Sequence, residues 1–399
     1  MFVKPLFYIV AVTHLIFFYV INLHTSITVD TILSKGIPGI FGITIVPSVS
    51  ILDCVGRVLM PLATESGYVK RSTLVMVDYL CTGVGFVAIS FVQSYPAMLI
   101  TCISFAVFSG HAVAVHNSLM GDFVGAEQVY LSNAIVTCIA AASFLTKPFV
   151  VGFFRDQHGS YDNLYRVMSG LMFLNALVWL AVNLTESIFL LRNSEMEEKE
   201  PKKTSTTPAL SHLCCRCTPA DENWLMAASC IAVTFLTGGT LRSTGILFVL
   251  LREQFGLSRE EAAWPLSLSS AAVAFSGILC QILLRWCARG HVLLFATFCQ
   301  LAGIFAAHYA PTFPMLAAAF GITHGIGSGL VFVLAGSFIE RHFTTKRRLI
   351  MHLNIAAFCG AGVVFPGLLL YVAGRFGRDK VLLFCAGFLF NVPLLSIFM

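Results

Sequence analysis

An acid and a base lie four residues apart inside an otherwise apolar stretch of this chain: Asp53 and Arg57. On a helix, residues at i and i+4 share one face, so the carboxylate can pair with the guanidinium. A permanently charged guanidinium fits the fork of a carboxylate, which makes Arg57 a candidate binding group for an organic anion. Protonation of Asp53 would free Arg57, so the pair can couple proton uptake to anion binding. The alternative is a self-neutralising pair that only permits burial.

Two more basic residues, Arg242 and Lys147, interrupt apolar runs. Arg242 has no acidic neighbour in sequence, so it should meet a carboxylate from another helix, a substrate, or the outer surface. We favour a second anion site. Lys147 precedes Pro148, where a helix should break and expose carbonyl groups that could hold the ammonium; function and local structure explain it equally well. Asp78 fits an interhelical or near-interface partner better than a proton carrier.

Histidine and cysteine provide no predicted metal site. The His residues in apolar runs lack metal-ligand spacing with another ligand type, and most should form interhelical hydrogen bonds; His116 is a candidate cavity residue. A polar segment holds Cys214, Cys215 and Cys217, which are candidate palmitoylation sites, weak metal ligands or inert thiols. P-loop, HExxH and nucleophile-elbow motifs are all missing, so we expect neither an enzyme nor a bound cofactor.

The elements that must position these residues follow from composition. Of the 399 residues, 57% are hydrophobic and 11% charged, and the mean hydropathy is +0.84. Soluble domains are about half apolar and about a quarter charged, so this is a membrane protein. Long continuous apolar runs favour helices over a β-barrel. The net charge of +5 follows mostly from membrane topology and predicts no nucleic-acid partner.

Hydropathy predicts an all-α membrane protein with about twelve transmembrane helices in two six-helix bundles. Residues 1–191 form the first bundle, 192–223 a cytoplasmic linker and 224–399 the second bundle. The predicted spans are Pro5 to Leu23, Ile37 to Ala63, Thr73 to Val92, Ala97 to Met120, Leu131 to Phe154, Val167 to Leu191, Trp224 to Leu251, Ala263 to Leu284, Val292 to Tyr309, Phe313 to Phe338, Leu349 to Ala373 and Val381 to Met399.

Basic residues in the loops predict the orientation, because Lys and Arg stay on the cytoplasmic side. They favour the side that holds the linker, which places both termini in the cytoplasm. Among the Lys and Arg residues, only Arg57, Lys147 and Arg242 fall within the predicted spans. A charge at mid-helix costs about 2.5–3.5 kcal/mol on insertion scales, so these three are functional candidates. The plasma membrane is the expected location.

The second half resembles the first half of the monocarboxylate transporters, which belong to the major facilitator superfamily. The resemblance covers an acidic-to-Trp segment before a first helix, the first-to-second helix region and a basic motif before the fifth helix. Its residues are Asp221, Glu222, Asn223 and Trp224, Arg242 and Ser243, Gln254 to Ser258, Ala263 and Trp264, and Phe343 with Lys346, Arg347 and Arg348. Leu353 replaces a usual Gly. The resemblance implies that Arg242 helps to receive a substrate carboxylate.

The first half is similar to that family's second half. Asp53 and Arg57 match the Asp-x-x-x-Arg pair of the eighth helix, which the resemblance ties to proton and carboxylate handling. Further matches are Gly56, Pro61, Leu62, Gly67 to Arg71, Asp122, Val124, Gly125, Pro148, Gly152, Asp156 and Gly159 to Tyr161. Lys147 departs from the small residue or Pro expected there. Parallel repeats keep every helix orientation when their order is exchanged. Two joined neighbouring genes are the alternative explanation.

The resemblance implies a secondary transporter of small monocarboxylates such as lactate or pyruvate, coupled to protons and working by alternating access. Arg57, Arg242 and His116 would bind substrate, and Asp53 would carry the proton. Expected partners are the anion, the proton, the lipid bilayer and a single-span ancillary protein. The alternatives are a carrier of another organic anion or an aromatic amino acid, and a non-transporting degenerate or mis-joined family member.

Overall fold

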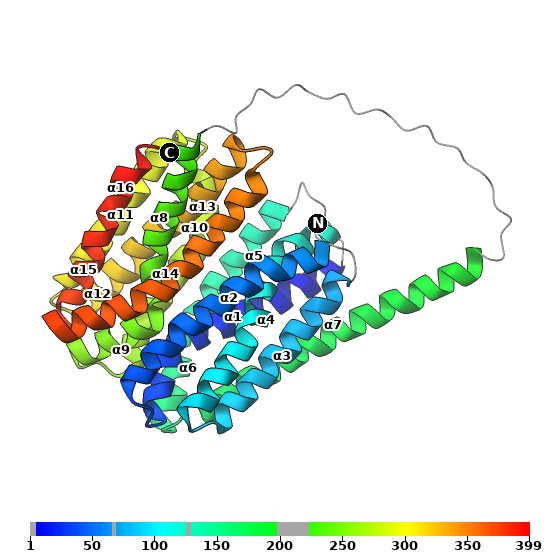
Figure 1. Ribbon diagram of the computed structural model, residues 1–399, viewed down its shortest axis with the longest axis horizontal. Helices are drawn as coiled ribbons and strands as arrows, with labels where there is room; N and C mark the ends of the chain where they lie inside the picture. Colours follow the sequence, from blue (N-terminus) through cyan, green and yellow to red (C-terminus); the bar gives the residue numbers. More distant parts are fainter. Residues whose placement is uncertain (1–4, 66–68, 125–128, 198–222) are drawn as a thin grey trace.

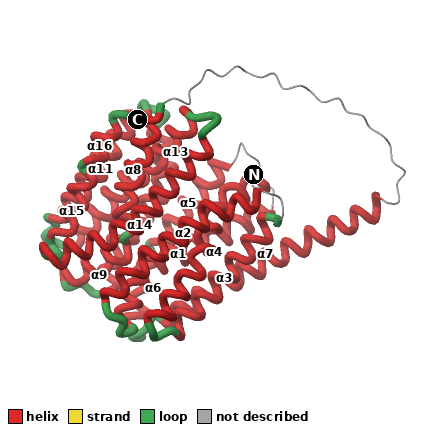
Figure 2. Tube along the Cα trace, viewed as in Figure 1, coloured by secondary structure: helices red, strands yellow, loops and turns green. Residues whose placement is uncertain are grey.

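The computed structural model describes residues 5–65, 69–124, 129–197 and 223–399, and within these ranges the chain is helical and contains no strand (Figures 1 and 2). The first half contains α1 (Pro5–Ser34), α2 (Gly39–Glu65), α3 (Arg71–Phe91), α4 (Tyr95–Val124), α5 (Val129–Phe144), α6 (Lys147–Val151), the π-helix η2 (Gly152–Gln157) and α7 (Asp162–Glu197).

The second half begins with α8, which starts at Trp224, and ends with α16 near the C-terminus (Figure 1). Its elements are α8 (Trp224–Arg242), α9 (Thr244–Phe255), α10 (Arg259–Leu283), α11 (Arg289–His308), α12 (Phe313–Leu316), the π-helix η3 (Ala317–His324), α13 (Gly325–His342), α14 (Arg347–Phe376), α15 (Lys380–Leu389) and α16 (Asn391–Ser396). Each of the twelve predicted spans therefore falls on one helix or on a run of consecutive helices.

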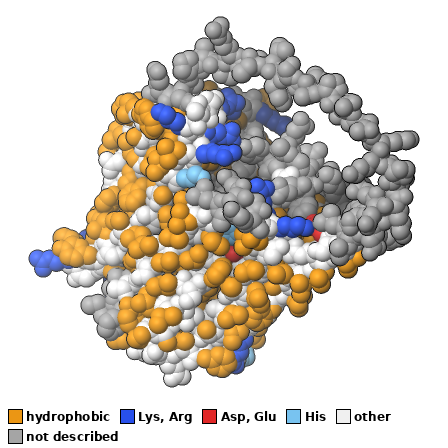
Figure 3. All heavy atoms as spheres, turned by 45° about the vertical axis from the view of Figure 1, so that its right-hand side comes forward, with side chains coloured by type: hydrophobic (Ala, Val, Ile, Leu, Met, Phe, Trp, Pro, Cys, Tyr) orange, Lys and Arg blue, Asp and Glu red, His pale blue; other side chains and the backbone are white. Residues whose placement is uncertain are grey.

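Nine of the described helices are long and apolar enough to cross a membrane. Helix α5 and the run from α6 through η2 meet at a 45° bend and form a tenth candidate span. Large side chains such as Phe91, Ile100 and Leu177 are exposed on the outside of the bundle, where a soluble protein would carry charges. Figure 3 shows this hydrophobic covering on one face. The molecule is an all-α membrane protein.

Several predicted boundaries are wrong. Helix α1 continues past Leu23 to Ser34, because residues 24–34 contain no Gly or Pro, and Gly36 with its positive φ of 74° follows its end. Helix α7 also continues through residues 192–197, while its candidate membrane span ends at Ile188, close to the predicted span end at Leu191. The predicted span from Trp224 to Leu251 is two helices, since the chain leaves helical geometry at Ser243.

The two halves pack through equivalent elements. Helix α2, the second span of the first half, contacts α14, the fifth span of the second half. The reciprocal contact joins α5, in the fifth span of the first half, to α10, the second span of the second half. Helix α1 also packs on α9. This reciprocity is what two parallel repeats related by an axis along the membrane normal produce.

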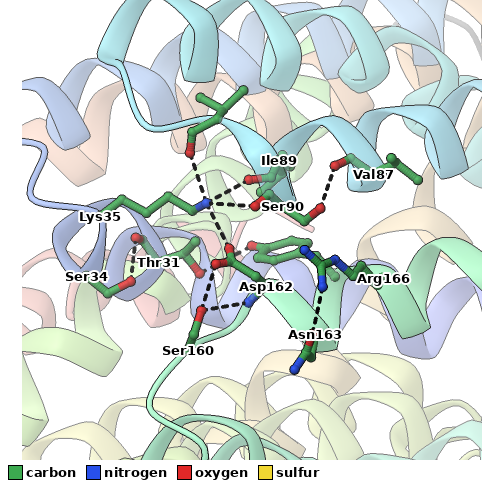
Figure 4. A network of polar contacts seen from close by, with 12 residues as sticks. Thr31, Ser34, Lys35, Val87, Ile89, Ser90, Ser160, Asp162, Asn163 and Arg166 are labelled. Carbon is green, nitrogen blue, oxygen red and sulfur yellow. Dashed lines mark hydrogen bonds and ion pairs between the residues drawn. The ribbon is translucent and has the colours of Figure 1, made fainter.

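A polar network holds the ends of α1, α3 and α7 together in the first half (Figure 4). The ammonium of Lys35 donates to the carbonyl oxygens of Ile89 and Val92, both at 2.9 Å, and pairs with Asp162 Oδ1 at 2.9 Å. Ser160 donates to the other carboxylate oxygen of Asp162 at 2.9 Å. Lys35 thus neutralises the acid that begins α7 and satisfies carbonyl groups at the end of α3.

Helix α2 packs closely on α4, and this packing fixes the position of α2 along its axis and its rotation. The close contact depends on two glycines. A Cβ at Gly56 would overlap the carbonyl oxygen of Val107, and one at Gly110 would overlap the backbone of Asp53. Small residues allow two membrane helices to approach this closely. The acid–base pair of α2 is therefore held against α4 by contacts that tolerate no side chain.

We predict that Gly56→Ala lowers the thermal stability of the purified protein, because overpacking in a fixed contact costs about 1–3 kcal/mol. Gly360→Ala on α14 is the matched control, since a Cβ there meets no atom closer than 3.8 Å. Both changes give the helix the same gain in propensity. Melting in detergent should rank Gly56→Ala below the wild type and Gly360→Ala at or above it. Equal melting temperatures for the two variants would contradict this packing argument.

Candidate functional site

Asp53 and Arg57 lie one turn apart on α2, and Arg242 lies in the last turn of α8. Helix α8 ends at Arg242 because Ser243 adopts a non-helical conformation, with φ −95° and ψ 14°. The carbonyl end of a helix carries partial negative charge, which favours a cation in its last turn. A break in the seventh predicted span thus places a guanidinium from the second half opposite the carboxylate of the first half.

One carboxylate oxygen joins the two arginines. Arg57 Nε donates to Asp53 Oδ2 at 3.0 Å, and Arg242 Nη2 donates to the same oxygen at 2.8 Å. The Asp53 side chain is 8% exposed and each guanidinium side chain 15%. Arg242 therefore meets a carboxylate from another helix, and the interpretation that it extends to the outer surface is wrong. The group carries two positive charges and one negative charge.

Three further residues complete this group, and none of them was identified from the sequence. Ser50 accepts a 3.3 Å hydrogen bond from Arg242 Nη2, and the thiol of Cys359 lies 3.8 Å from Asp53 Oδ2. Gly362 of α14 leaves room for both Ser50 and Arg242, since a Cβ there would lie 2.5 Å and 3.0 Å from their side chains. The position of Ser50, one turn before Asp53, was the available signal.

Two cavities adjoin the group between the halves. The smaller one is lined by Asp53, Arg57 and Arg242 together with His24 and Ser109. The larger cavity, of about 520 Å³, is lined by Arg57 and Arg242 and by side chains from both halves. Pockets for small ligands measure about 300–1,000 Å³ and combine apolar walls with a few polar groups. Both arginines thus face a cavity of the size of a ligand site.

Lys147 is buried at the bend between α5 and α6, as the break before Pro148 predicts. Its ammonium donates to Asn22 Oδ1 on α1 and to Ser270 Oγ on α10, the latter at 3.3 Å. The Phe144 ring centroid lies 5.0 Å from the same nitrogen. The expectation that freed carbonyl groups hold this ammonium is wrong, because side chains from both halves hold it.

Of the remaining sequence candidates, neither His116 nor Asp78 lines a cavity beside the arginines. His116 stacks on His14 with 3.3 Å between ring centroids, and it lines neither cavity described above. Asp78 is an interhelical partner, since its carboxylate lies 2.6 Å from His111 Nδ1 in the first half. Cys214, Cys215 and Cys217 lie outside the described residues. The described residues contain no group of three side chains suited to a metal ion.

A second acid joins the halves at the end opposite the linker, and the sequence reasoning missed it. Asp30 of α1 accepts hydrogen bonds from Arg252 Nη1 and Arg259 Nε of the second half, both at 2.8 Å. The Tyr161 hydroxyl donates to the same carboxylate at 2.9 Å. Arg259 Nη1 also lies 3.5 Å from Asp156 Oδ1. The predicted end of the first span at Leu23 had left Asp30 outside the helix.

A tight turn aims the two arginines at Asp30. Gly256 ends α9 in the left-handed region, with φ 63°, which glycine adopts without strain. Ser258 and Glu261 then form a reciprocal capping box that starts α10. Because α9 ends just before this turn and α10 begins just after it, Arg252 and Arg259 approach the carboxylate from two helices.

We predict that Asp53→Asn is strongly destabilising, since removing one partner of a buried ion pair costs about 3–5 kcal/mol. Arg242→Gln in that background should recover part of the loss, because one of the two uncompensated charges is then gone. Ser50→Ala is the mild control, as it removes only a 3.3 Å contact. A double-mutant cycle on melting temperature measures the coupling. Strictly additive effects of Asp53→Asn and Arg242→Gln would contradict the shared-carboxylate geometry.

Comparisons with known proteins agree with this architecture. The Major Facilitator Superfamily sequence model matches residues 61–366. Human (Homo sapiens) monocarboxylate transporter 11 is 30% identical over 161 residues, 40% of this chain and 34% of that protein. Mouse (Mus musculus) monocarboxylate transporter 9 is 24% identical over 169 residues, 42% of this chain and 33% of that protein. Human monocarboxylate transporter 14 is 26% identical over 160 residues, 40% of this chain and 31% of that protein.

The alignments thus span about a third of each relative. With a family match over more than half of its length, the chain belongs to the Major Facilitator Superfamily and is similar to its monocarboxylate transporters.

Proposed function

We propose that this protein is a proton-coupled secondary transporter of small monocarboxylates such as lactate or pyruvate. The observation that carries the proposal is the single carboxylate of Asp53 held between Arg57 and Arg242 beside the cavity. Two guanidiniums from opposite halves form a fork that suits a carboxylate ligand. The names of the similar transporters support the same substrate class.

Asp53 occupies the place that a substrate carboxylate would take. When a proton neutralises Asp53, both arginines lose their internal partner, and an incoming monocarboxylate replaces it. The formal charge of the three side chains is +1 with Asp53 ionised, and it is again +1 with one proton and one monocarboxylate bound. The loaded and empty sites thus carry equal charge, so loading does not change the electrostatic cost of moving the site relative to the membrane.

Alternating access requires contacts between the halves that form and break. The ion pairs of Asp30 with Arg252 and Arg259 join the halves at the end opposite the linker. With the linker and both termini in the cytoplasm, as the distribution of Lys and Arg predicts, these pairs close the outer side in the plasma membrane. If the ion pairs of Asp30 broke, the cavity would open to the outside, while Arg242 and Asp53 would stay near the axis about which the halves rock.

We predict that cells expressing the chain take up more labelled lactate at an outside pH of about 6 than of about 8, because the incoming anion displaces Asp53 from the two arginines and the displaced carboxylate takes up a proton. Arg57→Ala should reduce this uptake about tenfold or more through the loss of a charge-assisted contact. Surface labelling is measured in parallel so that uptake is expressed per molecule.

Arg375→Ala provides the matched control, because Arg375 is exposed near the end of α14 and contributes to neither cavity. Its uptake should equal that of the wild type at both pH values. A wild-type chain at the cell surface that carries no lactate at either pH would refute the substrate assignment and favour another organic anion or a non-transporting protein.

A further inference from the structure

The ammonium of Lys147 lies directly behind the wall of the larger cavity. Its two hydrogen-bond partners, Asn22 and Ser270, and the ring of Phe144 beside it all line that cavity. The three come from α1, α10 and α5, so both halves contribute. Lys147 itself is 1% exposed. One layer of side chains thus separates the buried amino group of Lys147 from the space that the two arginines face.

Lys147 has no anionic partner among the side chains that the structure describes. Its contacts are an amide oxygen, a hydroxyl and an aromatic face, and no carboxylate lies within ion-pair distance. A buried charge is costly unless an opposite charge compensates it. Among the described residues, Asp53 is the only acid that lines either cavity, and it already has two arginines. The arrangement lacks a counter-anion at the Lys147 end.

Polar groups on the second-half side of the cavity also lack partners. Thr234 Oγ1 and Ser269 Oγ are buried without a hydrogen bond, and both residues line the cavity. Ser269 adjoins Ser270, which contacts Lys147. Asn354 Oδ1, on the same cavity wall, has no partner either. Buried polar atoms nearly always have partners, so these groups indicate a ligand with more than one polar end.

We propose that the larger cavity accepts dicarboxylates, with one carboxylate on Arg57 and Arg242 and the second on Lys147. The inference rests on the proposed function, because it names a wider substrate class for the same cavity. The second carboxylate replaces Asn22 and Ser270 as acceptor of the ammonium's hydrogen bonds. A cavity of about 520 Å³ has room for an acid longer than lactate. Lys147 is then a residue that determines substrate specificity.

The test compares acids of equal chain length that differ by one carboxylate, namely butyrate with succinate and hexanoate with adipate. Uptake and KM are measured in the full chain and in Lys147→Met, which removes the charge and keeps an unbranched side chain. For the better diacid, Lys147→Met should raise KM about tenfold or more, the loss of one charge-assisted contact. KM for the matching monoacid should stay the same. Ser270→Ala is the control that alters the surroundings of Lys147 and keeps its charge.

Each outcome separates this inference from the proposed function. Uptake of the monoacids without either diacid would overturn the dicarboxylate site and leave monocarboxylate transport standing. Equal loss of both substrate types in Lys147→Met would show a structural role for Lys147 and also overturn the inference. Uptake of no acid at all would refute both. Should Lys147→Met fail to reach the membrane, competition in the wild type decides: the better diacid must inhibit labelled monoacid uptake at lower concentration than the unlabelled monoacid does.

Discussion

One carboxylate shared by two guanidiniums is the interaction on which the structure depends. Asp53 belongs to the first half, and Arg242 comes from the other half of the chain. The effective dielectric constant of a protein interior is well below that of water, so the contact is strong while all three groups are paired. Removing one partner leaves a costly buried charge. The same oxygen atom therefore joins the two halves, and in the proposed function it occupies the position that an anionic ligand would take.

The arrangement at Asp30 repeats this logic at the end opposite the linker. There too an acid of the first half receives two arginines, and both arginines belong to the second half. One bridge lies beside the cavities and the other at the end of the bundle, so they play different parts. In the proposed transport cycle the bridge at Asp53 would exchange with a ligand, whereas the bridge at Asp30, which lines neither cavity, would respond to movement of the halves.

The sequence predicted much of this because the strongest signals are local. Apolar runs of span length predicted an all-α membrane protein. The four-residue spacing of Asp53 and Arg57 placed both residues on one helix face. The break before Pro148 follows from proline's missing N–H. Contacts between distant segments carry no such local pattern. The pairing of Arg242 with Asp53 stayed one of several interpretations, and the Asn22 and Ser270 contacts of Lys147 were not foreseen.

Boundary errors account for the largest omission. Asp30 fell outside the first predicted span, since hydropathy weakens after Leu23 although the helix continues to Ser34. A charged residue is tolerated there because arginines from the other half neutralise it. The need for glycine at position 362 could not be predicted from the sequence either, because it arises from the close approach of α14 to Ser50. His116 was selected for its side-chain chemistry alone. Its ring stacks on His14, which belongs to a different helix, α1.

The central claim is that Asp53 competes with a substrate anion for Arg57 and Arg242. Binding of a labelled monocarboxylate to the purified protein, measured at acidic and alkaline pH in the wild type and in Asp53→Asn, tests it most directly. The account predicts tight binding by the wild type only in acid, and binding by Asp53→Asn that is equally tight at both pH values. An Asp53→Asn protein that is folded and keeps the pH dependence of the wild type would contradict the account.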